Sequence, residues 1–144
     1  MRHVDLFSGI GGFALAVDVV WPDSEHIFCD NEPFSQAILK KHWPNSKIYG
    51  DIRSFTNTRS EELGGLSQQP WTSNPEDRTC DLLTGGFPCQ PFSHAGRRKG
   101  TTDDRYLWPE MLRVIQEFHP RWVIGENVGG LVSWNEGIPF LRPA

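Results

Sequence analysis

The sequence has few cysteines, a small net charge and no long apolar run. Three cysteines among 144 residues cannot all pair, which excludes a secreted domain built on disulfides. No apolar run approaches the ~20 residues of a membrane span, and the N-terminus has no signal-like segment. The net charge of −4 argues against a self-sufficient nucleic-acid binder. We therefore expect one soluble, cytoplasmic domain with no membrane partner.

Short apolar runs alternate with amphipathic segments. Strands are expected at residues 2–7, 26–30, 47–49, 80–84 and 122–124. Helices are expected from Phe13 to the Trp21-Pro22 stop, from Pro33 onward, and over 107–118. Their expected apolar faces are Phe13, Ala16, Val17 and Val20; Phe34, Ala37, Ile38 and Lys41; and Leu107, Met111, Val114, Ile115 and Phe118. Strands that alternate with helices predict an α/β fold with a mainly parallel sheet and ligands over its carboxyl edge.

Two groups of residues follow predicted strands, at positions where nucleotide-binding proteins have their ligand-binding residues. The turn Ser8-Gly9-Ile10-Gly11-Gly12 separates a strand from a helix, although it is not a G-x-G-x-x-G motif. Its glycines allow a close approach to a ligand, and the helix N-terminus offers free N–H groups. Glu32 lies 20 positions after Gly12 and fits an acceptor for ribose hydroxyls. The alternative for Glu32 is an acid at a helix N-terminus, because Pro33 begins a helix.

A proline-flanked cysteine follows the predicted strand at 80–84. The run is Gly85-Gly86-Phe87-Pro88-Cys89-Gln90-Pro91-Phe92-Ser93, in which two prolines fix φ on either side of Cys89. Most lone cysteines are small core residues, and we expect this for Cys29 and Cys80. A loop bracketed by prolines is a poor place to bury a side chain. Cys89 is therefore a candidate nucleophile.

This loop and three further motifs resemble the cytosine-C5 DNA methyltransferases. The other motifs are Asp5-Leu6-Phe7-Ser8-Gly9-Ile10-Gly11-Gly12-Phe13, Gly50-Asp51-Ile52 and Glu126-Asn127-Val128, in the order of that family. The resemblance spans nearly the whole chain. It implies a Rossmann-like, S-adenosylmethionine-dependent methyltransferase fold with helices on both faces of the sheet, incomplete at the C-terminus.

The resemblance implies S-adenosyl-L-methionine as the cofactor and no metal. Asp51 would then hydrogen-bond the adenine amino group, and Ile52 would pack on the ring. The residues implied in cofactor binding are Phe7, Ser8, Gly9, Ile10, Gly11, Gly12, Glu32, Pro33, Asp51, Ile52, Gly86 and Leu107.

The chemistry of that family would need a thiolate that adds to C6 of cytosine, and Cys89 is the candidate. Glu126, protonated or sharing a proton, would bond N3; burial at the strand end would raise its pKa, while a plain structural acid is the alternative. Asn127 would fix the loop or bind the base amino group, and Pro88 and Gln90 complete the expected catalytic set. The base must be flipped out of the duplex. Ser93, Arg97 and Arg98 are expected to contact the flanking phosphate or the vacated space, with a solvated turn as the alternative for the two arginines.

Residues 1–144 would then form the N-terminal cofactor-binding and catalytic part of a methyltransferase domain, with residues 53–79 as a long surface loop. The family's Gln-x-Arg-x-Arg segment does not occur, and the target recognition region is absent, so we expect a fragment with little methylating activity of its own. Duplex DNA in a bacterial or phage setting is the expected substrate, and a cognate restriction endonuclease is a candidate partner. The alternatives are a tRNA cytosine-C5 methyltransferase of the same family and a non-catalytic cofactor-binding remnant. A dinucleotide-dependent oxidoreductase is a further alternative, but it would give neither Cys89 nor Glu126 a chemical role.

Overall fold

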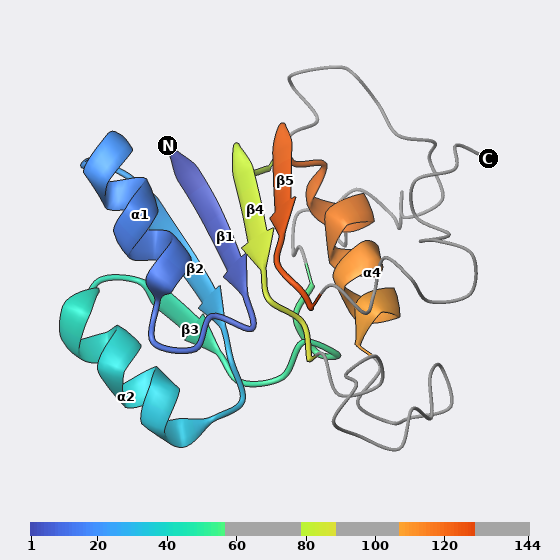
Figure 1. The fold of residues 1–144 in the computed structure, drawn as a ribbon, viewed down its shortest axis with the longest axis horizontal. Helices are drawn as coiled ribbons and strands as arrows, with labels where there is room; N and C mark the ends of the chain where they lie inside the picture. Colours follow the sequence, from blue (N-terminus) through green and yellow to red (C-terminus); the bar gives the residue numbers. More distant parts are fainter. Residues whose placement is uncertain (57–78, 89–106, 129–144) are drawn as a thin grey trace.

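A computed structural model gives the structure of this chain for residues 1–56, 79–88 and 107–128. It contains one sheet in the order β3-β2-β1-β4-β5, and each pair of neighbours is parallel. The strand arrows in Figure 1 accordingly point the same way, so the loops that follow them lie along one edge. The predicted parallel sheet is confirmed. The strands are β1 (Arg2–Leu6), β2 (Glu25–Cys29), β3 (Lys47–Tyr49), β4 (Leu82–Gly85) and β5 (Trp122–Gly125).

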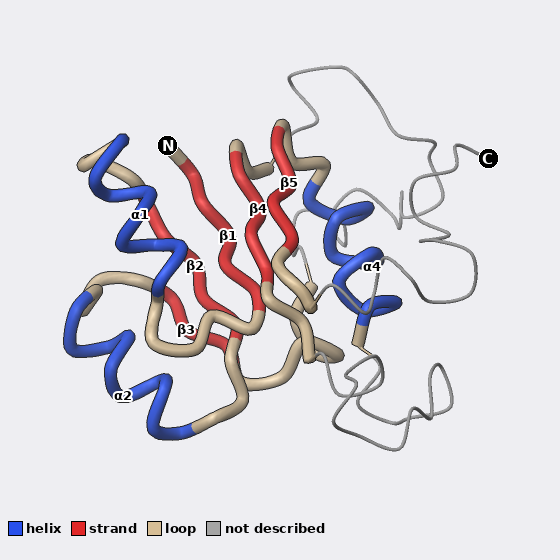
Figure 2. The backbone as a smooth tube through the Cα atoms, in the orientation of Figure 1, coloured by secondary structure: helices blue, strands red, loops and turns tan. Residues whose placement is uncertain are grey.

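Helices cover both faces of the sheet, as predicted (Figure 2). Helices α1 (Gly12–Val20) and α2 (Pro33–His42) pack against one face, where Ala14 and Leu39 meet Phe28. Helix α4 (Trp108–Phe118) packs against the other face. Within the described residues, no helix is long and apolar enough to cross a membrane.

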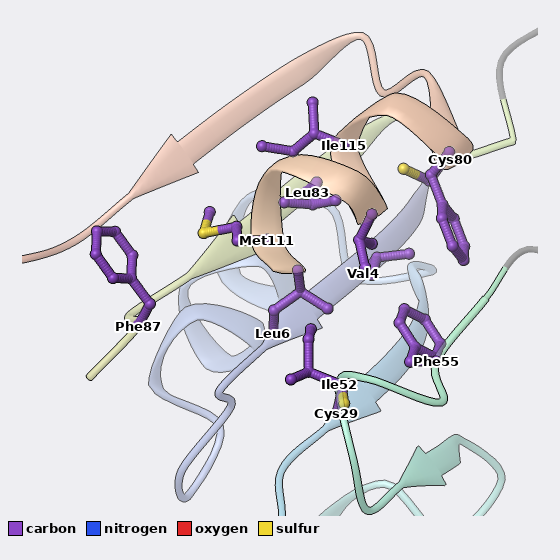
Figure 3. Packing of buried hydrophobic residues seen from close by; sticks show 12 residues of the cluster. Val4, Leu6, Cys29, Ile52, Phe55, Cys80, Leu83, Phe87, Met111 and Ile115 are labelled. Carbon is purple, nitrogen blue, oxygen red and sulfur yellow. The ribbon is translucent and has the colours of Figure 1, made fainter. Parts of the chain in front are cut away.

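The larger core lies between the sheet and α4 (Figure 3). Val4 and Leu6 of β1 and Leu83 of β4 face this helix. The expected face of α4 is confirmed, because its residues Met111, Val114, Ile115 and Phe118 are buried and Leu107 is half-buried against the same cluster.

Cys29 and Cys80 are buried in the same core. Burial raises the pKa of both thiols to about 12, with a further contribution from Asp30 for Cys29 and from Asp81 for Cys80. Neither thiol is therefore ionised near neutral pH. This agrees with the structural role that we predicted for them.

The expected apolar faces of the first two helices are wrong in part. In α2 the buried residues are Ser35 and Leu39, whereas Phe34 is 68 % exposed. In α1 the buried residues are Ala14 and Val17, and Ala16 and Val20 are exposed, as are Ala37 and Lys41 in α2. A short helix on a sheet buries only a narrow stripe, and the side chains beneath it select that stripe. Here Phe28 selects the small Ala14 and the branched Leu39.

A chain of buried polar side chains crosses the sheet on the face covered by α1. The Nδ1 atoms of His3 and His26 lie 2.9 Å apart, and Nε2 of His3 lies 2.9 Å from the Thr84 hydroxyl. Thr84 also hydrogen-bonds one carboxyl oxygen of Asp5. At the other end, Nε2 of His26 lies 2.8 Å from Oδ1 of Asp18. Oδ2 of Asp5 is buried and finds no hydrogen-bond partner among the described residues.

Candidate functional site

The turn after β1 is tightly curled. Phe7, Gly9 and Gly11 have positive φ values of 55°, 53° and 88°. This is uncommon for a residue other than glycine, so Phe7 is held there by its surroundings, the core cluster on which it packs. Gly11 is the N-cap of α1 and has no side chain with which to cap it. The N–H groups of the first turn of α1 therefore receive no capping hydrogen bond from a side chain.

Ser8 shapes this turn from inside. Its buried hydroxyl donates to the Asp5 carbonyl at 2.6 Å and accepts from the Cys29 amide at 3.2 Å. Ser8 is one of the predicted cofactor residues, but its hydroxyl is already hydrogen-bonded to main-chain groups of the protein. Ile10 and Gly12 are exposed, and a Cβ on Gly9 or Gly12 would meet no heavy atom within 4 Å. This leaves space beside the turn.

Gly11→Ala should lower the free energy of unfolding by roughly 3 kcal/mol, and Gly9→Ala by about 1 kcal/mol. Both residues have positive φ, but a Cβ on Gly11 would lie 2.5 Å from the ring of Trp43. That ring cannot shift freely, because it donates to Asp18 and packs against Phe28. Urea denaturation of the two variants measures the difference. Equal losses would show that backbone strain alone, without the Trp43 contact, sets the cost.

Asp30 joins the glycine turn to the loop after β2. Its Oδ2 accepts from the Gly9 amide at 2.8 Å, and its Oδ1 accepts from the Glu32 amide at 2.9 Å. One carboxylate therefore sets the separation of two loops that the sequence assigns to the cofactor. We had not predicted this role for Asp30. The available signal was an acid at the end of an apolar strand, directly before Asn31-Glu32.

Glu32 is exposed at the start of α2. It occupies the N-cap position, but its side chain makes no capping hydrogen bond, and Pro33 follows it in the first turn. Glu32 therefore lies at a helix N-terminus, as the alternative expects, and its carboxylate makes no hydrogen bond to the helix backbone. An acid at this position is free to accept hydrogen bonds from a ligand.

Asp51 and Ile52 follow β3 and have opposite environments. The Asp51 side chain is 55 % exposed, and its Oδ1 accepts from the Arg53 amide at 2.9 Å. Ile52 is only 4 % exposed and belongs to the core beneath the sheet edge. The expected packing of Ile52 on an adenine ring thus has little side-chain surface to use, and Ile52 anchors the loop instead.

The loops after β4 and β5 are held together. The Glu126 amide donates to the Gly85 carbonyl at 2.9 Å, and the Asn127 side chain donates to the Phe87 carbonyl at 2.8 Å. A Cβ on Gly86 would lie 3.3 Å from the Glu126 carboxylate, so Gly86 makes room for that side chain. The contact of Asn127 is the loop-fixing role that we expected. The expected burial of Glu126 is wrong, because Glu126 is exposed; it follows β5, whose residues are themselves exposed.

The remaining predicted residues divide into two groups. Pro88 and Leu107 are half-buried at the ends of described segments, and Leu107 is the N-cap of α4. Cys89, Gln90, Ser93, Arg97 and Arg98 lie outside the described residues, as does most of the predicted loop at 53–79. The structure therefore brings Glu32, Asp51, Glu126 and Asn127 to one sheet edge, in the loops after β2, β3 and β5.

Sequence comparison identifies the family behind this arrangement. The family model for the C-5 cytosine-specific DNA methylases matches residues 1–141. The chain belongs to this family. Individual methylases agree with the assignment: M2.BsuMI of Bacillus subtilis is 32 % identical over 142 residues, and M.AluI of Cellulosimicrobium cellulans is 37 % identical over 132 residues. Both carry the name Type II methyltransferase.

These methylases are longer than this chain. The match covers 95 % of the chain and 31 % of M2.BsuMI, and 90 % of the chain and 23 % of M.AluI. For M.AquIA of a Picosynechococcus species, 34 % identical, it covers 94 % of the chain and 52 % of the relative. A crystal structure of a Spodoptera frugiperda DNMT2 mutant shares the fold with a TM-score of 0.64 at 20 % identity, over 94 % of this chain and 38 % of that one.

Proposed function

We propose that this methylase-family chain forms the cofactor-binding and catalytic part of a DNA cytosine-C5 methyltransferase. The methyl donor is S-adenosylmethionine, and the acceptor is a flipped-out cytosine in duplex DNA. The observation that carries the proposal is the presence of three exposed carboxylates, Glu32, Asp51 and Glu126, at the carboxyl ends of parallel strands in one sheet. Asp51 and Glu126 lie in motifs of the family. The DNA methylase family and relatives named Type II methyltransferases support DNA as the substrate. A bacterial cytoplasmic setting and a restriction endonuclease as partner are part of the same proposal.

The residues present fit the proposed cofactor. Glu32 keeps its carboxylate free of α2, which suits the ribose hydroxyls, and the open space at Gly9 and Gly12 suits a ligand against the main chain. Asp51 is exposed two residues after β3, which suits the amino group of adenine. When bound, S-adenosylmethionine supplies an electrophilic methyl group.

The residues that follow β4 and β5, on the other side of β1 from the proposed cofactor loops after β2 and β3, act on the cytosine base. The Cys89 thiolate adds to C6, while a proton held by Glu126 neutralises the charge that develops at N3. With S-adenosylmethionine bound, its S–CH3 bond would break as C5 gains the methyl group, leaving S-adenosylhomocysteine. C5 would then lose its proton to a water molecule, and the C6–S bond would break to return the Cys89 thiolate. Asn127 positions the loop that leads to Cys89, because it holds the Phe87 carbonyl.

Glu32→Gln should weaken binding of S-adenosylhomocysteine by about tenfold or more, since a hydrogen bond to a charged acceptor is replaced by a neutral one. Isothermal titration calorimetry measures the dissociation constant. Glu25→Gln is the matched control, because Glu25 is an exposed acid at the opposite end of the same strand β2. If the chain binds no S-adenosylhomocysteine, or if both variants bind like the parent, the proposed cofactor site is wrong.

The choice between DNA and tRNA is tested by methyl acceptance. Tritiated S-adenosylmethionine is offered with cytosine-containing duplex DNA or with tRNA, using the polypeptide that the complete reading frame encodes. Label in DNA supports the proposal. Label in tRNA alone would favour the tRNA methyltransferase alternative.

A further inference from the structure

Arg113 on α4 reaches across to the segment that follows β3. Its Nη2 donates to the Ile52 carbonyl at 2.7 Å and to the Phe55 carbonyl at 3.0 Å. A single guanidinium nitrogen therefore holds two carbonyls of the turn that begins directly after Asp51.

Two acids fix the guanidinium in turn. Glu110 accepts from Nε of Arg113 at 3.0 Å, and Glu117 accepts from Nη1 at 2.6 Å. The second oxygen of Glu117 accepts from the Thr56 hydroxyl at 2.9 Å. Two residues of α4 thus fix the orientation of the guanidinium plane. A guanidinium held in this way forms hydrogen bonds of defined direction in addition to its electrostatic attraction.

Apolar contacts hold the same turn from below. The rings of Phe55 and Phe118 are stacked with their centroids 5.1 Å apart, and Ile52 and Phe55 point into the core in Figure 3. Apolar packing fixes depth but is non-directional. The polar contacts determine how the turn is rotated about its buried residues. They therefore also determine the direction in which the Asp51 carboxylate points.

We propose that Arg113 is a positioning residue that sets where Asp51 presents its carboxylate to the purine ring of the cofactor. The inference rests on the proposed cofactor site. Recognition of an amino group requires an acceptor held to about half an ångström, which a turn anchored by apolar contacts alone does not provide. Arg113 acts through the main chain of this turn, because its contacts there are with the Ile52 and Phe55 carbonyls.

The test compares two ligands that differ at the purine: S-adenosylhomocysteine, with an amino group, and S-inosylhomocysteine, with a carbonyl oxygen. The parent chain should prefer the adenosyl ligand by at least about tenfold, because Asp51 accepts from the amino group and repels the oxygen. In Arg113→Met the preference should fall to about twofold or less, with affinity for the inosyl ligand changed by less than about threefold. Glu110→Gln is the matched control: it removes one contact to Arg113 and none to the turn, so the preference should persist.

A merely structural role would move stability without moving this ratio. If Arg113→Met keeps the parent's preference, the inference is overturned, even where its melting temperature falls. Should Arg113→Met fail to fold, Arg113→Lys carries the test, since an ammonium keeps the charge but not the fork. Hydrogen exchange gives a second readout, with faster exchange expected at the amides of Ser54 and Phe55, which bond within the turn. A parent chain that binds neither ligand would instead overturn the proposed function, and the inference with it.

Discussion

Cys89→Ala should abolish the covalent complex with DNA that contains 5-fluorocytosine and reduce methyl transfer by at least about a thousandfold. Fluorine cannot leave C5 as a proton does, so an adduct formed by the thiolate at C6 persists after the methyl group has been added. Denaturing electrophoresis of the polypeptide from the complete reading frame measures the adduct as a shifted band. The loss is large because no other group takes over a missing nucleophile.

The matched control for this prediction is Cys80→Ala. Cys80 is buried, and the raised pKa of its thiol keeps it un-ionised, so this variant should lose some stability and keep the adduct. A covalent band in Cys89→Ala, or its loss in Cys80→Ala at full folding, would contradict the assignment of the nucleophile. Asn127→Ala should lie between the two, because it releases the Phe87 carbonyl without removing the thiol.

Asp5→Asn and His3→Gln should give stability curves of opposite slope between about pH 4 and pH 6. Burial raises the pKa of Asp5 from 3.8 to about 6, with the Thr84 hydrogen bond opposing the shift and Asp30 adding to it. Burial lowers the pKa of His3 from 6.5 to about 4, with His26 adding to the shift and Asp18 opposing it. Both groups are therefore neutral in the folded chain through most of this range.

The sign of each contribution follows from the proton balance. Between pH 4 and 6 the folded chain keeps a proton on Asp5 that the unfolded chain has lost, so this contribution falls as pH rises. Between pH 4 and 6.5 the unfolded chain holds a proton on His3 that the folded chain lacks, so this contribution rises with pH. Each amounts to about 3 kcal/mol over its window, and the two nearly cancel in the parent.

The hydrogen bonds agree with this protonation. Thr84 has one hydroxyl proton and two partners, so it must accept from one of them. Thr84 donates to Oδ1 of Asp5, so its hydroxyl accepts from Nε2–H of a neutral His3, whose Nδ1 then accepts from Nδ1–H of His26. The buried Oδ2 of Asp5 has no hydrogen-bond partner among the described residues, an environment that disfavours a negative charge on this carboxyl group.

Each variant removes one of the two opposing contributions, so the pH dependence of the other residue becomes measurable. Asp5→Asn leaves His3, so its stability should rise with pH, whereas His3→Gln leaves Asp5, so its stability should fall. The difference in unfolding free energy between the two should change by roughly 5 kcal/mol from pH 4 to pH 6, measured by urea denaturation. Asp23→Asn, at an exposed acid, should run parallel to the parent. Parallel curves for the two core variants would show that the pair is charged in the folded chain.

Motif positions could be predicted from the sequence because each follows a short apolar strand. Glycine or an acid directly after such a run marks the carboxyl edge of a parallel sheet, and Glu32 and Asp51 lie there as expected. The buried faces of α1 and α2 could not be predicted. In a segment as apolar as Gly12–Val20 several stripes are equivalent by hydropathy, and the ring of Phe28 on another element selects one.

Contacts between polar residues far apart in the chain could not be predicted from the sequence either. Asp30 and Arg113 join separate loops through main-chain groups, and a main-chain group has no sequence signature. The exposure of Glu126 could not be predicted either, because a strand's depth in a sheet depends on what lies beside it. In contrast, α4 has a single apolar stripe flanked by acids and an arginine, so its buried face was determined locally.

The strand order has a consequence for synthesis. Residues 1–52 contain β1, β2 and β3 and all the loops that we assign to the ribose and purine, but β1 lies between β2 and β4 in the finished sheet. Until β4 emerges, one side of β1 is an unpaired edge, open to pairing with another nascent chain. At 5–20 residues per second the wait from Tyr49 to Leu82 is about 2 to 7 seconds. During that interval His3 and Asp5 remain beside water, and the arrival of Thr84 both closes the edge and removes them from solvent.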